Sequence, residues 1–295
     1  MAHMSEQPRT VEIPIRGGRV EAFRVPGGAP SGTPLLVLGG VETSLRPLAG
    51  TEQILARRWE ARAARRPVVV LGRPLPDEPS QVEAAMHPRV IADAVATVIR
   101  WLAQMGGPRP PYAIEAESGG GRISLWLTVD HPELVTRLVL ASVASETPPE
   151  SAMAARMAQW VEMAERNDWG MFFSHMAVVM RPASGGGQAP SFEAAARLQP
   201  RPATPERFIA ELKATLDPSS FVTDRLGEIA APTLVLAGGL DQVVPPDATR
   251  LVAERIPGAR LEIDPECGHT VRSSFSDYND LVEAFLAEGD HGRQP

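Results

Sequence analysis

Residues 112–129 read YAIEAESGGGRISLWLTV and decide the fold. The apolar run that opens this stretch predicts a buried strand, and the apolar run that closes it predicts a buried helix. Between them stands Ser118, with Ala116 two positions before it and Gly120 two positions after it. Small residues are needed at both positions because strand and helix pass close together at so sharp a turn. The sequence therefore predicts a serine at the tip of a strand–turn–helix unit.

A small-x-Ser-x-Gly match also occurs in ordinary loops, so its meaning depends on the residues further along the chain. Asp241 directly follows a predicted buried strand, and His269 follows the last predicted strand in Cys267-Gly268-His269. A serine needs a base to become nucleophilic, and the base needs an acid to orient it. The three residues together predict a nucleophilic site.

The composition narrows the class of protein. The chain has 295 residues, of which 43% are hydrophobic and 22% are charged, and its formal net charge is -7. An acidic chain is a poor partner for nucleic acid or an anionic membrane, and no apolar run approaches the roughly 18 residues of a membrane span. Because Cys267 is the only cysteine, no internal disulfide can form, and we expect a cytoplasmic location.

Short apolar runs alternate with helical patterns along most of the chain. Residues 1–10 look tag-derived or disordered, and we expect residues 289–295 to be a disordered tail. Strands are predicted at 11–15, 19–25, 35–38, 67–71, 112–116, 137–142, 232–237 and 260–263, and helices at 48–59, 88–103, 247–256 and 276–287. Such alternation favours an α/β fold with a mostly parallel sheet and helices on both faces. Residues 147–228 break the alternation with helical patterns, and they follow a strand end, where such sheets bind ligands.

With this serine, acid and histidine in this order, the chain resembles the α/β-hydrolase family of serine esterases, lactonases and thioesterases. The resemblance covers about residues 11–287. It implies an eight-stranded, mostly parallel sheet flanked by helices, with a helical lid after the sixth strand. The core would then comprise residues 11–146 and 229–288, and the lid (cap) residues 147–228.

The resemblance also implies roles for the site residues. Ser118 is expected to be the nucleophile, His269 the general base and Asp241 the acid that orients it, with Glu146 kept open as an alternative acid. The oxyanion hole would use the backbone N–H groups of Val41 and Gly119.

The oxyanion loop departs from the family pattern. It reads Gly39-Gly40-Val41 where the family often has His-Gly-x, which leaves the anchoring of the loop open.

The predicted reaction is hydrolysis of an ester, lactone or thioester. A serine at this turn argues against the dehalogenases and epoxide hydrolases of the fold, which use aspartate there. An acyltransferase or macrocyclising thioesterase, an amide-cleaving aminopeptidase-like hydrolase and a non-catalytic ligand-binding homologue remain open. We predict no cofactor and no metal, because neither a zinc-type histidine pair nor a phosphate-binding glycine loop is present.

Apolar residues in the helical insertion predict a bulky hydrophobic substrate. The expected substrate contacts are Glu42, Glu117, Trp160, Trp169, Phe172 and Met176. The two glutamates would recognise a cationic or hydroxylated group, although Glu117 could instead pair with an arginine such as Arg73 or Arg122. Residues 184–187, Ser-Gly-Gly-Gly, are the expected lid hinge. The partner is therefore a small-molecule ester, lactone or thioester, with no nucleic acid and no membrane, and the protein is expected to be a monomer or homodimer.

Overall fold

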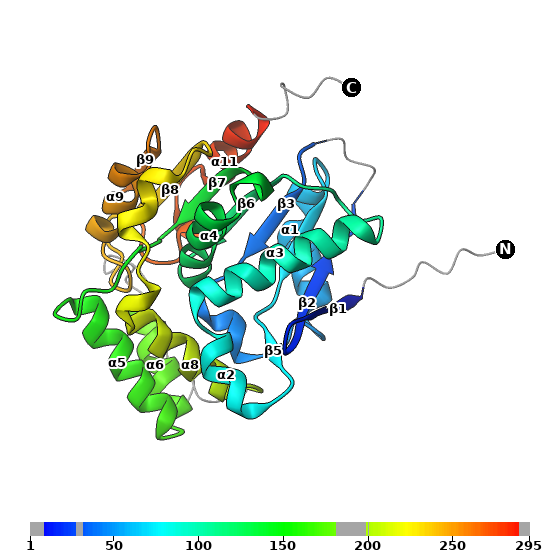
Figure 1. The fold of residues 1–295 in the computed structure, drawn as a ribbon. Coiled ribbons are helices and arrows are strands. Elements are labelled where there is room, and N and C mark those ends of the chain that lie inside the picture. The colour runs from blue at the N-terminus through cyan, green and yellow to red at the C-terminus, as the bar shows by residue number, and fades with distance from the viewer. Residues whose placement is uncertain (1–8, 28–31, 181–198, 200, 289–295) are drawn as a thin grey trace.

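The computed structural model describes residues 9–27, 32–180, 199 and 201–288 (Figure 1). The expected hinge at residues 184–187 and the expected tail at 289–295 lie outside the described residues, as do residues 1–8. Residue 10 was expected in a disordered or tag-derived segment, but it already belongs to the first strand.

A single mixed sheet forms the centre of the molecule. Its spatial order is β1-β2-β4-β3-β6-β7-β8-β9, and the short strand β5 pairs with β2. All neighbours from β4 to β9 are parallel, whereas β2 runs antiparallel to β1, β4 and β5. The strands are β1 (Thr10–Ile15), β2 (Gly18–Arg24), β3 (Leu35–Leu38), β4 (Val68–Leu71), β5 (Leu75–Pro76), β6 (Tyr112–Glu117), β7 (Val135–Ala141), β8 (Thr233–Gly238) and β9 (Arg260–Asp264). The predicted mostly parallel sheet is thus confirmed, with β5 as an addition too short for any sequence pattern.

Helices cover both faces of the sheet because successive strand residues point in opposite directions. In β3, Leu36 and Leu38 pack in the core under α3, α4 and α9, and Leu35 and Val37 pack in the core under α1 and α11. The helices are α1 (Glu52–Ala63), α2 (Val82–Ala85), α3 (Pro88–Gln104), α4 (Gly119–Asp130), α5 (Ala152–Glu165), α6 (Trp169–Val179), α8 (Pro205–Leu216), α9 (Pro246–Arg255), α10 (Val271–Ser274) and α11 (Tyr278–Ala287). Short 3-10 turns lie at Val41–Leu45, Pro79–Gln81, Pro132–Leu134, Pro218–Ser220 and Thr223–Glu228.

Two helix starts differ from the sequence prediction for a backbone reason. The helix expected from residue 48 begins at Glu52, because Gly50 adopts φ +88° in the preceding turn. The helix expected from residue 276 begins at Tyr278, because Asp277 has a left-handed conformation with φ 57°. A residue with positive φ cannot continue a right-handed helix.

The helices α5, α6 and α8 lie between β7 and β8 in the chain and form a group of their own in Figure 1. We call residues 147–228 the helical insertion. Its apolar core includes Leu45, Ala144 and Val243, which follow the carboxyl ends of β3, β7 and β8. The helical insertion therefore packs against the edge of the sheet where ligands bind in α/β proteins.

Candidate active site

Ser118 occupies the tight turn between β6 and α4. It adopts φ 51° and ψ -122°, a conformation that non-glycine residues rarely take. Its N–H donates to Ala141 O at 2.9 Å and its carbonyl accepts from Gly121 N at 2.9 Å, so the neighbouring strand and the new helix hold the strained residue in place. The side chain is thereby presented at the carboxyl end of the strand.

The glycines after Ser118 allow the backbone to approach other segments closely. A Cβ atom on Gly120 would lie 2.3 Å from both Leu38 O and Gly39 O. A Cβ atom on Gly121 would lie 2.1 Å from Val143 Cγ2. These distances explain in physical terms why the sequence carries small residues here.

The structure brings Ser118, His269 and Asp241 together from three distant segments. His269 Nε2 lies 3.2 Å from Ser118 Oγ, and His269 Nδ1 lies 2.8 Å from Asp241 Oδ2. All three side chains lie at loop positions after β6, β9 and β8, respectively. A neutral imidazole in this position can accept the serine proton at Nε2 while its Nδ1–H donates to the carboxylate.

Asp241 is fixed so that only one of its oxygens faces the histidine. Its Oδ1 accepts from the N–H groups of Val243 at 2.8 Å and Val244 at 2.9 Å, which leaves Oδ2 for His269. Glu146 was the alternative acid, but in the structure the residue that contacts His269 Nδ1 is Asp241.

The charges around His269 favour its protonated form. Burial alone would lower the pKa of His269, but the charge and hydrogen bond of Asp241, with the charges of Glu117 and Glu42, raise this pKa above its usual value. The imidazolium that forms during proton transfer is therefore stabilised.

Two backbone N–H groups lie where an oxyanion could be bound. Val41 and Gly119 are the first residues of a 3-10 turn and of α4, and the first N–H of a helix has no acceptor within it. The two residues adjoin each other, since a Cβ atom on Gly119 would lie 3.3 Å from Val41 N. Both line the same pocket as Ser118.

Arg73 anchors the loop that carries Val41. Its Nη2 donates to Gly39 O at 2.9 Å and to Gly40 O at 3.0 Å, and its Nε donates to both carboxylate oxygens of Glu211 on α8. The Gly40 carbonyl and the Val41 N–H belong to one peptide unit and point in opposite directions. By holding the carbonyl on one side, Arg73 directs the N–H to the other side. A buried arginine thus anchors the loop that lacks the family's histidine.

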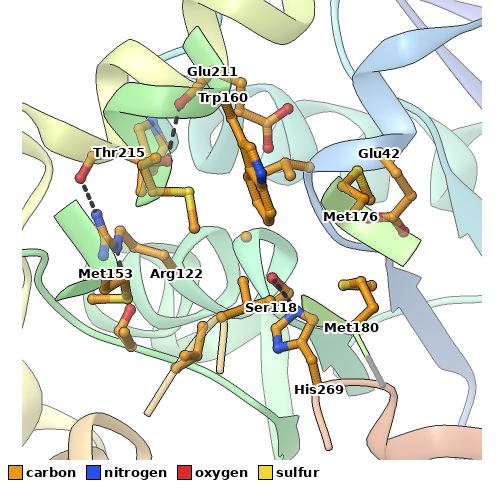
Figure 2. A pocket seen from close by; sticks show the side chains of 17 residues that line it. Glu42, Ser118, Arg122, Met153, Trp160, Met176, Met180, Glu211, Thr215 and His269 are labelled. Carbon is orange, nitrogen blue, oxygen red and sulfur yellow. Dashed lines mark hydrogen bonds between the residues drawn. The ribbon is translucent and has the colours of Figure 1, made fainter. Parts of the chain in front are cut away.

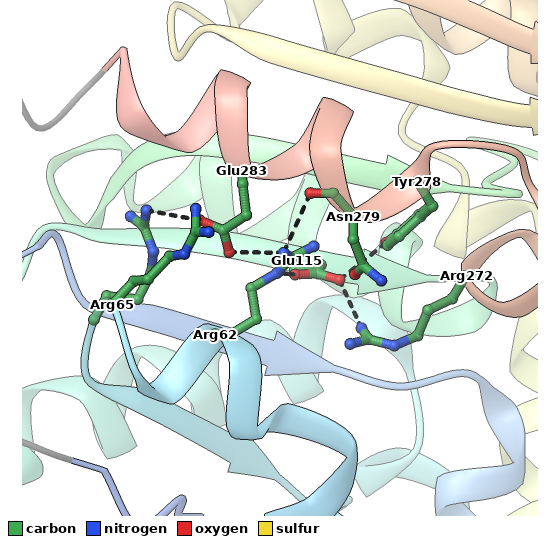
Figure 3. A network of polar contacts seen from close by, with 8 residues as sticks. Arg62, Arg65, Glu115, Arg272, Tyr278, Asn279 and Glu283 are labelled. Atoms are coloured by element: carbon green, nitrogen blue, oxygen red, sulfur yellow. Dashed lines mark hydrogen bonds and ion pairs between the residues drawn. The ribbon is translucent and has the colours of Figure 1, made fainter.

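A buried ionic network supports the nucleophile strand and the histidine loop (Figure 3). Glu115 on β6 stands three residues before the serine and is buried. It accepts from Arg62 Nε at 3.1 Å, Arg272 Nη1 at 2.6 Å and the hydroxyl of Tyr278 at 3.0 Å. Arg272 stands three residues after the histidine. The Glu115–Arg272 pair therefore ties together the two segments that must meet in the site.

The pocket around Ser118 is mainly apolar, and its empty space, which is partly open to solvent, is about 660 Å³ (Figure 2). Trp160 on α5 forms part of its wall, and its indole N–H donates to His175 Nδ1 at 2.8 Å. Burial, together with the nearby Arg156, lowers the pKa of His175, so this ring is neutral and can accept the bond. The lining consists of Val41, Glu42, Pro88, Ser118, Gly119, Arg122, Ala144, Met153, Met157, Trp160, Met176, Met180, Glu211, Thr215, Val243, Val244 and His269.

The structure separates the expected substrate contacts into two groups. Trp160, Met176 and Glu42 line the pocket. Trp169 and Phe172 do not line it, because they are buried in an aromatic cluster with Phe173 and Phe208 inside the helical insertion. The apolar pattern of the helical insertion pointed to both residues, but such a pattern does not show which apolar side chains face the cavity.

Glu117 also lies elsewhere than expected. It lines a neighbouring pocket with Arg58 and Arg272, although Glu42 belongs to both pockets. Its Oε2 lies 3.9 Å from Arg58 Nη2, so its arginine partner is neither Arg73 nor Arg122. Burial and the charge of Glu42 raise the pKa of Glu117.

Three charged residues at the site were not among the predicted site residues: Arg73, Glu211 and Arg122. Arg73 follows a predicted buried strand by two residues, which was a usable signal for a loop at the site. Arg122 stands four residues after Ser118, and helical spacing places positions four apart on one face. Glu211 lies in the helical insertion with no sequence pattern to mark it.

No group of three or more metal-binding side chains occurs among the residues that the structure describes. Within the same residues, no helix combines the length and the apolar character that crossing a membrane requires.

Comparison with known proteins agrees with the geometry. A family model described as alpha/beta hydrolase fold matches residues 73–271, about two thirds of the chain. The 2-hydroxymuconate semialdehyde hydrolase of Pseudomonas putida is 28% identical over 211 residues, which cover 68% of this chain and 72% of that protein. The pimeloyl-[acyl-carrier protein] methyl ester esterase of Nitrosomonas europaea is 29% identical over 176 residues, covering 56% of this chain and 66% of that protein.

Solved structures show the same fold at lower identity. MGS-M2, an alpha/beta hydrolase from a deep-sea metagenome library, has a TM-score of 0.72 at 16% identity and covers 97% of this chain and 98% of its own. Est816, described as an N-acyl homoserine lactone degrading enzyme, has a TM-score of 0.66 at 23% identity and covers 93% of this chain and 100% of its own. The chain belongs to the α/β-hydrolase fold family, and it is a hydrolytic enzyme.

Proposed function

We propose that this protein is a serine hydrolase that cleaves an ester, lactone or thioester of a hydrophobic small molecule through an acyl-enzyme on Ser118. The observation that carries the proposal is the 3.2 Å contact between His269 Nε2 and Ser118 Oγ, with His269 Nδ1 held by Asp241. A serine hydroxyl is a weak nucleophile at neutral pH, and an adjacent oriented base activates it.

The proposed reaction has two halves. Ser118 Oγ attacks the acyl carbon as its proton passes to His269 Nε2, and the N–H groups of Val41 and Gly119 stabilise the oxyanion. The bond to the leaving oxygen or sulfur then breaks, and His269 gives its proton to that atom. A water molecule next attacks the acyl carbon, again losing a proton to His269, and the carboxylic acid departs as Ser118 regains its hydrogen.

The apolar pocket supports a hydrophobic substrate. Met153, Met157, Met176 and Met180 line it, and methionine side chains adapt to irregular apolar ligands. In this proposal the helical insertion acts as a lid over the site. Ester and lactone chemistry is supported by the methyl ester esterase of Nitrosomonas europaea and by Est816. With one buried cysteine and no disulfide, we also propose that the protein works in the cytoplasm, as a monomer or homodimer.

A fluorophosphonate probe tests the nucleophile directly. We expect labelling of the wild-type protein, with the mass of one phosphonyl group on the peptide that contains Ser118. Labelling should vanish in Ser118→Ala and fall by orders of magnitude in His269→Ala. Labelling at another residue, or undiminished labelling of Ser118→Ala, would overturn the proposal.

A substrate panel then distinguishes the reaction classes. It comprises p-nitrophenyl esters of increasing chain length, an acyl thioester, a γ-lactone, an aminoacyl p-nitroanilide and 2-hydroxymuconate semialdehyde, the last because of the relative from Pseudomonas putida. We expect turnover of the first three kinds and little of the anilide. A protein that is labelled at Ser118 but turns over only the anilide, or only the semialdehyde, would contradict the ester assignment.

A further inference from the structure

Arg122 is a buried cation inside the pocket that contains the nucleophile. It lies in the first turn of α4, four residues after Ser118, and both residues line the same pocket. Its side chain is buried, and it lines the pocket together with Ala144, Met153 and Thr215 (Figure 2).

Only neutral oxygens hold the Arg122 guanidinium. Nε donates to Ala144 O at 3.2 Å, Nη1 donates to Thr215 O at 2.8 Å and Ser220 Oγ at 3.2 Å, and Nη2 donates to Thr147 Oγ1 at 2.8 Å. A guanidinium has five N–H donors, so these four bonds leave one N–H of Nη2. Across the described part of the chain, no carboxylate oxygen comes within 4.0 Å of Arg122.

Two other buried arginines, Arg73 and Arg62, pair with carboxylates, whereas the buried Arg207 donates to the neutral oxygens of Arg73, Pro74 and Thr204 and does not line the pocket. Arg73 pairs with Glu211 at 2.9 Å, and Arg62 pairs with Glu115 at 3.1 Å and Glu283 at 2.7 Å. Burial lowers the pKa of Arg122 to about 10, against a raising effect of Glu146, so the group remains a cation at neutral pH. A buried cation without a counter-ion is costly, and an anion that enters the pocket would remove that cost.

We propose that Arg122 binds a carboxylate at the far end of the substrate's acyl group, so that the preferred substrates are monoesters of short dicarboxylic acids whose hydrophobic part is the alcohol. This inference rests on the proposed function, because the acyl group is the part attached to Ser118. A single negative charge matches the single cation, whereas the nearby carboxylates of Glu211 and Glu42 disfavour a phosphate dianion.

The shape of the site assigns the carboxylate to the acyl side. On the side away from Arg122 (Figure 2), the pocket shares Glu42, Met176 and Met180 with a larger hollow of about 1160 Å³, a value that includes open solvent. The leaving group departs through the larger space, while the acyl group stays bound at the Arg122 end until water releases it.

Matched ester pairs test the inference. Monomethyl glutarate and methyl pentanoate have acyl chains of the same length and differ in the terminal carboxylate, and acid release by both is followed in a pH-stat. We expect kcat/KM to favour the glutarate ester by about tenfold or more. The reversed pair, 5-acetoxypentanoate and pentyl acetate, carries the carboxylate on the alcohol side and should show no such preference. Equal rates for the first pair, or a preference only in the second pair, would overturn the proposal.

Variants connect the preference with the residue. In Arg122→Met the glutarate-to-pentanoate ratio should fall to about one, whatever the overall rate, and Arg122→Lys should restore part of it. Arg156→Met removes a charge from α5, outside the pocket, and should keep the wild-type ratio. A ratio that survives in Arg122→Met would show that Arg122 only cross-links the segments it touches.

A binding measurement separates this inference from the catalytic proposal. In Ser118→Ala, which cannot form an acyl-enzyme, calorimetry should give a Kd for monomethyl glutarate about tenfold below that for methyl pentanoate. If this difference appears but the wild-type protein hydrolyses neither ester, the proposed function fails while the carboxylate site stands. If methyl pentanoate is hydrolysed but binds as tightly as the glutarate ester, the carboxylate site fails alone.

Discussion

Arg73, in the loop after β4, and Glu211, on helix α8, form a buried ion pair that joins the core to the helical insertion. Arg73 Nε lies 2.9 and 3.0 Å from the two carboxylate oxygens, and neither side chain exposes more than 3% of its surface. The same guanidinium holds the carbonyl of the peptide unit whose N–H belongs to Val41. A residue of the helical insertion thus supports a backbone donor of the core.

Removing this guanidinium should lower catalysis and stability together. In Arg73→Met we expect kcat for a p-nitrophenyl ester to fall about 100-fold, because the Val41 N–H loses its fixed direction. Urea unfolding should show a loss of about 3–5 kcal/mol, since Glu211 remains buried without its partner. Arg73→Lys keeps the charge, so its kcat and its unfolding free energy should lie between those of the wild type and of Arg73→Met. A well-folded Arg73→Met protein with wild-type kcat would contradict the positioning role.

The pH dependence should reflect the acidic surroundings of His269. The imidazole must be neutral to accept the serine proton, so activity is present above its pKa and is lost as the pH falls through it. Because Asp241, Glu117 and Glu42 raise this pKa, the acidic limb of kcat/KM should lie above the value of about 6.5 for free histidine. Glu117→Gln should move that limb to lower pH. Glu133→Gln, whose carboxylate pairs with Arg100 on the surface, is the control and should not move it.

The turn after Ser118 should tolerate no side chain. In Gly120→Ala the new methyl group would meet two backbone oxygens at 2.3 Å, so the strand or the helix must shift. We expect a loss of about 1–3 kcal/mol in unfolding free energy and a fall in kcat. Gly227→Ala is the matched control, because nothing lies within 4 Å of its Cβ position, and its stability should change by no more than about 0.5 kcal/mol. Equal stabilities for the two variants would refute the close approach.

The apolar residues of the helical insertion should separate into two kinds by experiment. Phe172 is fully buried in the aromatic cluster, so Phe172→Ala should cost about 3–5 kcal/mol of stability with similar effects on short and long esters. Met176 lines the pocket, so Met176→Ala should raise KM for long-chain esters more than for acetyl esters. Urea unfolding and steady-state kinetics of both variants check this. A chain-length effect in Phe172→Ala would place that residue in the binding site after all.

Local patterns, together with the family resemblance, were sufficient to predict the sheet and the three residues that meet at its edge. Buried parallel strands are short apolar runs, and the turn that carries Ser118 requires small residues that are visible in the sequence. The strand β5 was missed, because two residues with a proline give no pattern. The partners of Arg73 and Glu117 were also beyond prediction, because an ion pair depends on how distant elements pack. Trp169 and Trp160 have the same apolar character, and only the packing of α5 against α6 and α8 shows which one faces the cavity.

The hydrogen bond from Trp160 to His175 has a practical consequence. The indole forms part of the pocket wall, and its N–H is bound to a ring that is neutral at physiological pH. A ligand that fills the cavity changes the electrostatic environment of the indole. Protonation of the His175 ring changes it as well. A change in the fluorescence of Trp160, measured against the other four tryptophans of the chain, should therefore report occupancy of the site without a label.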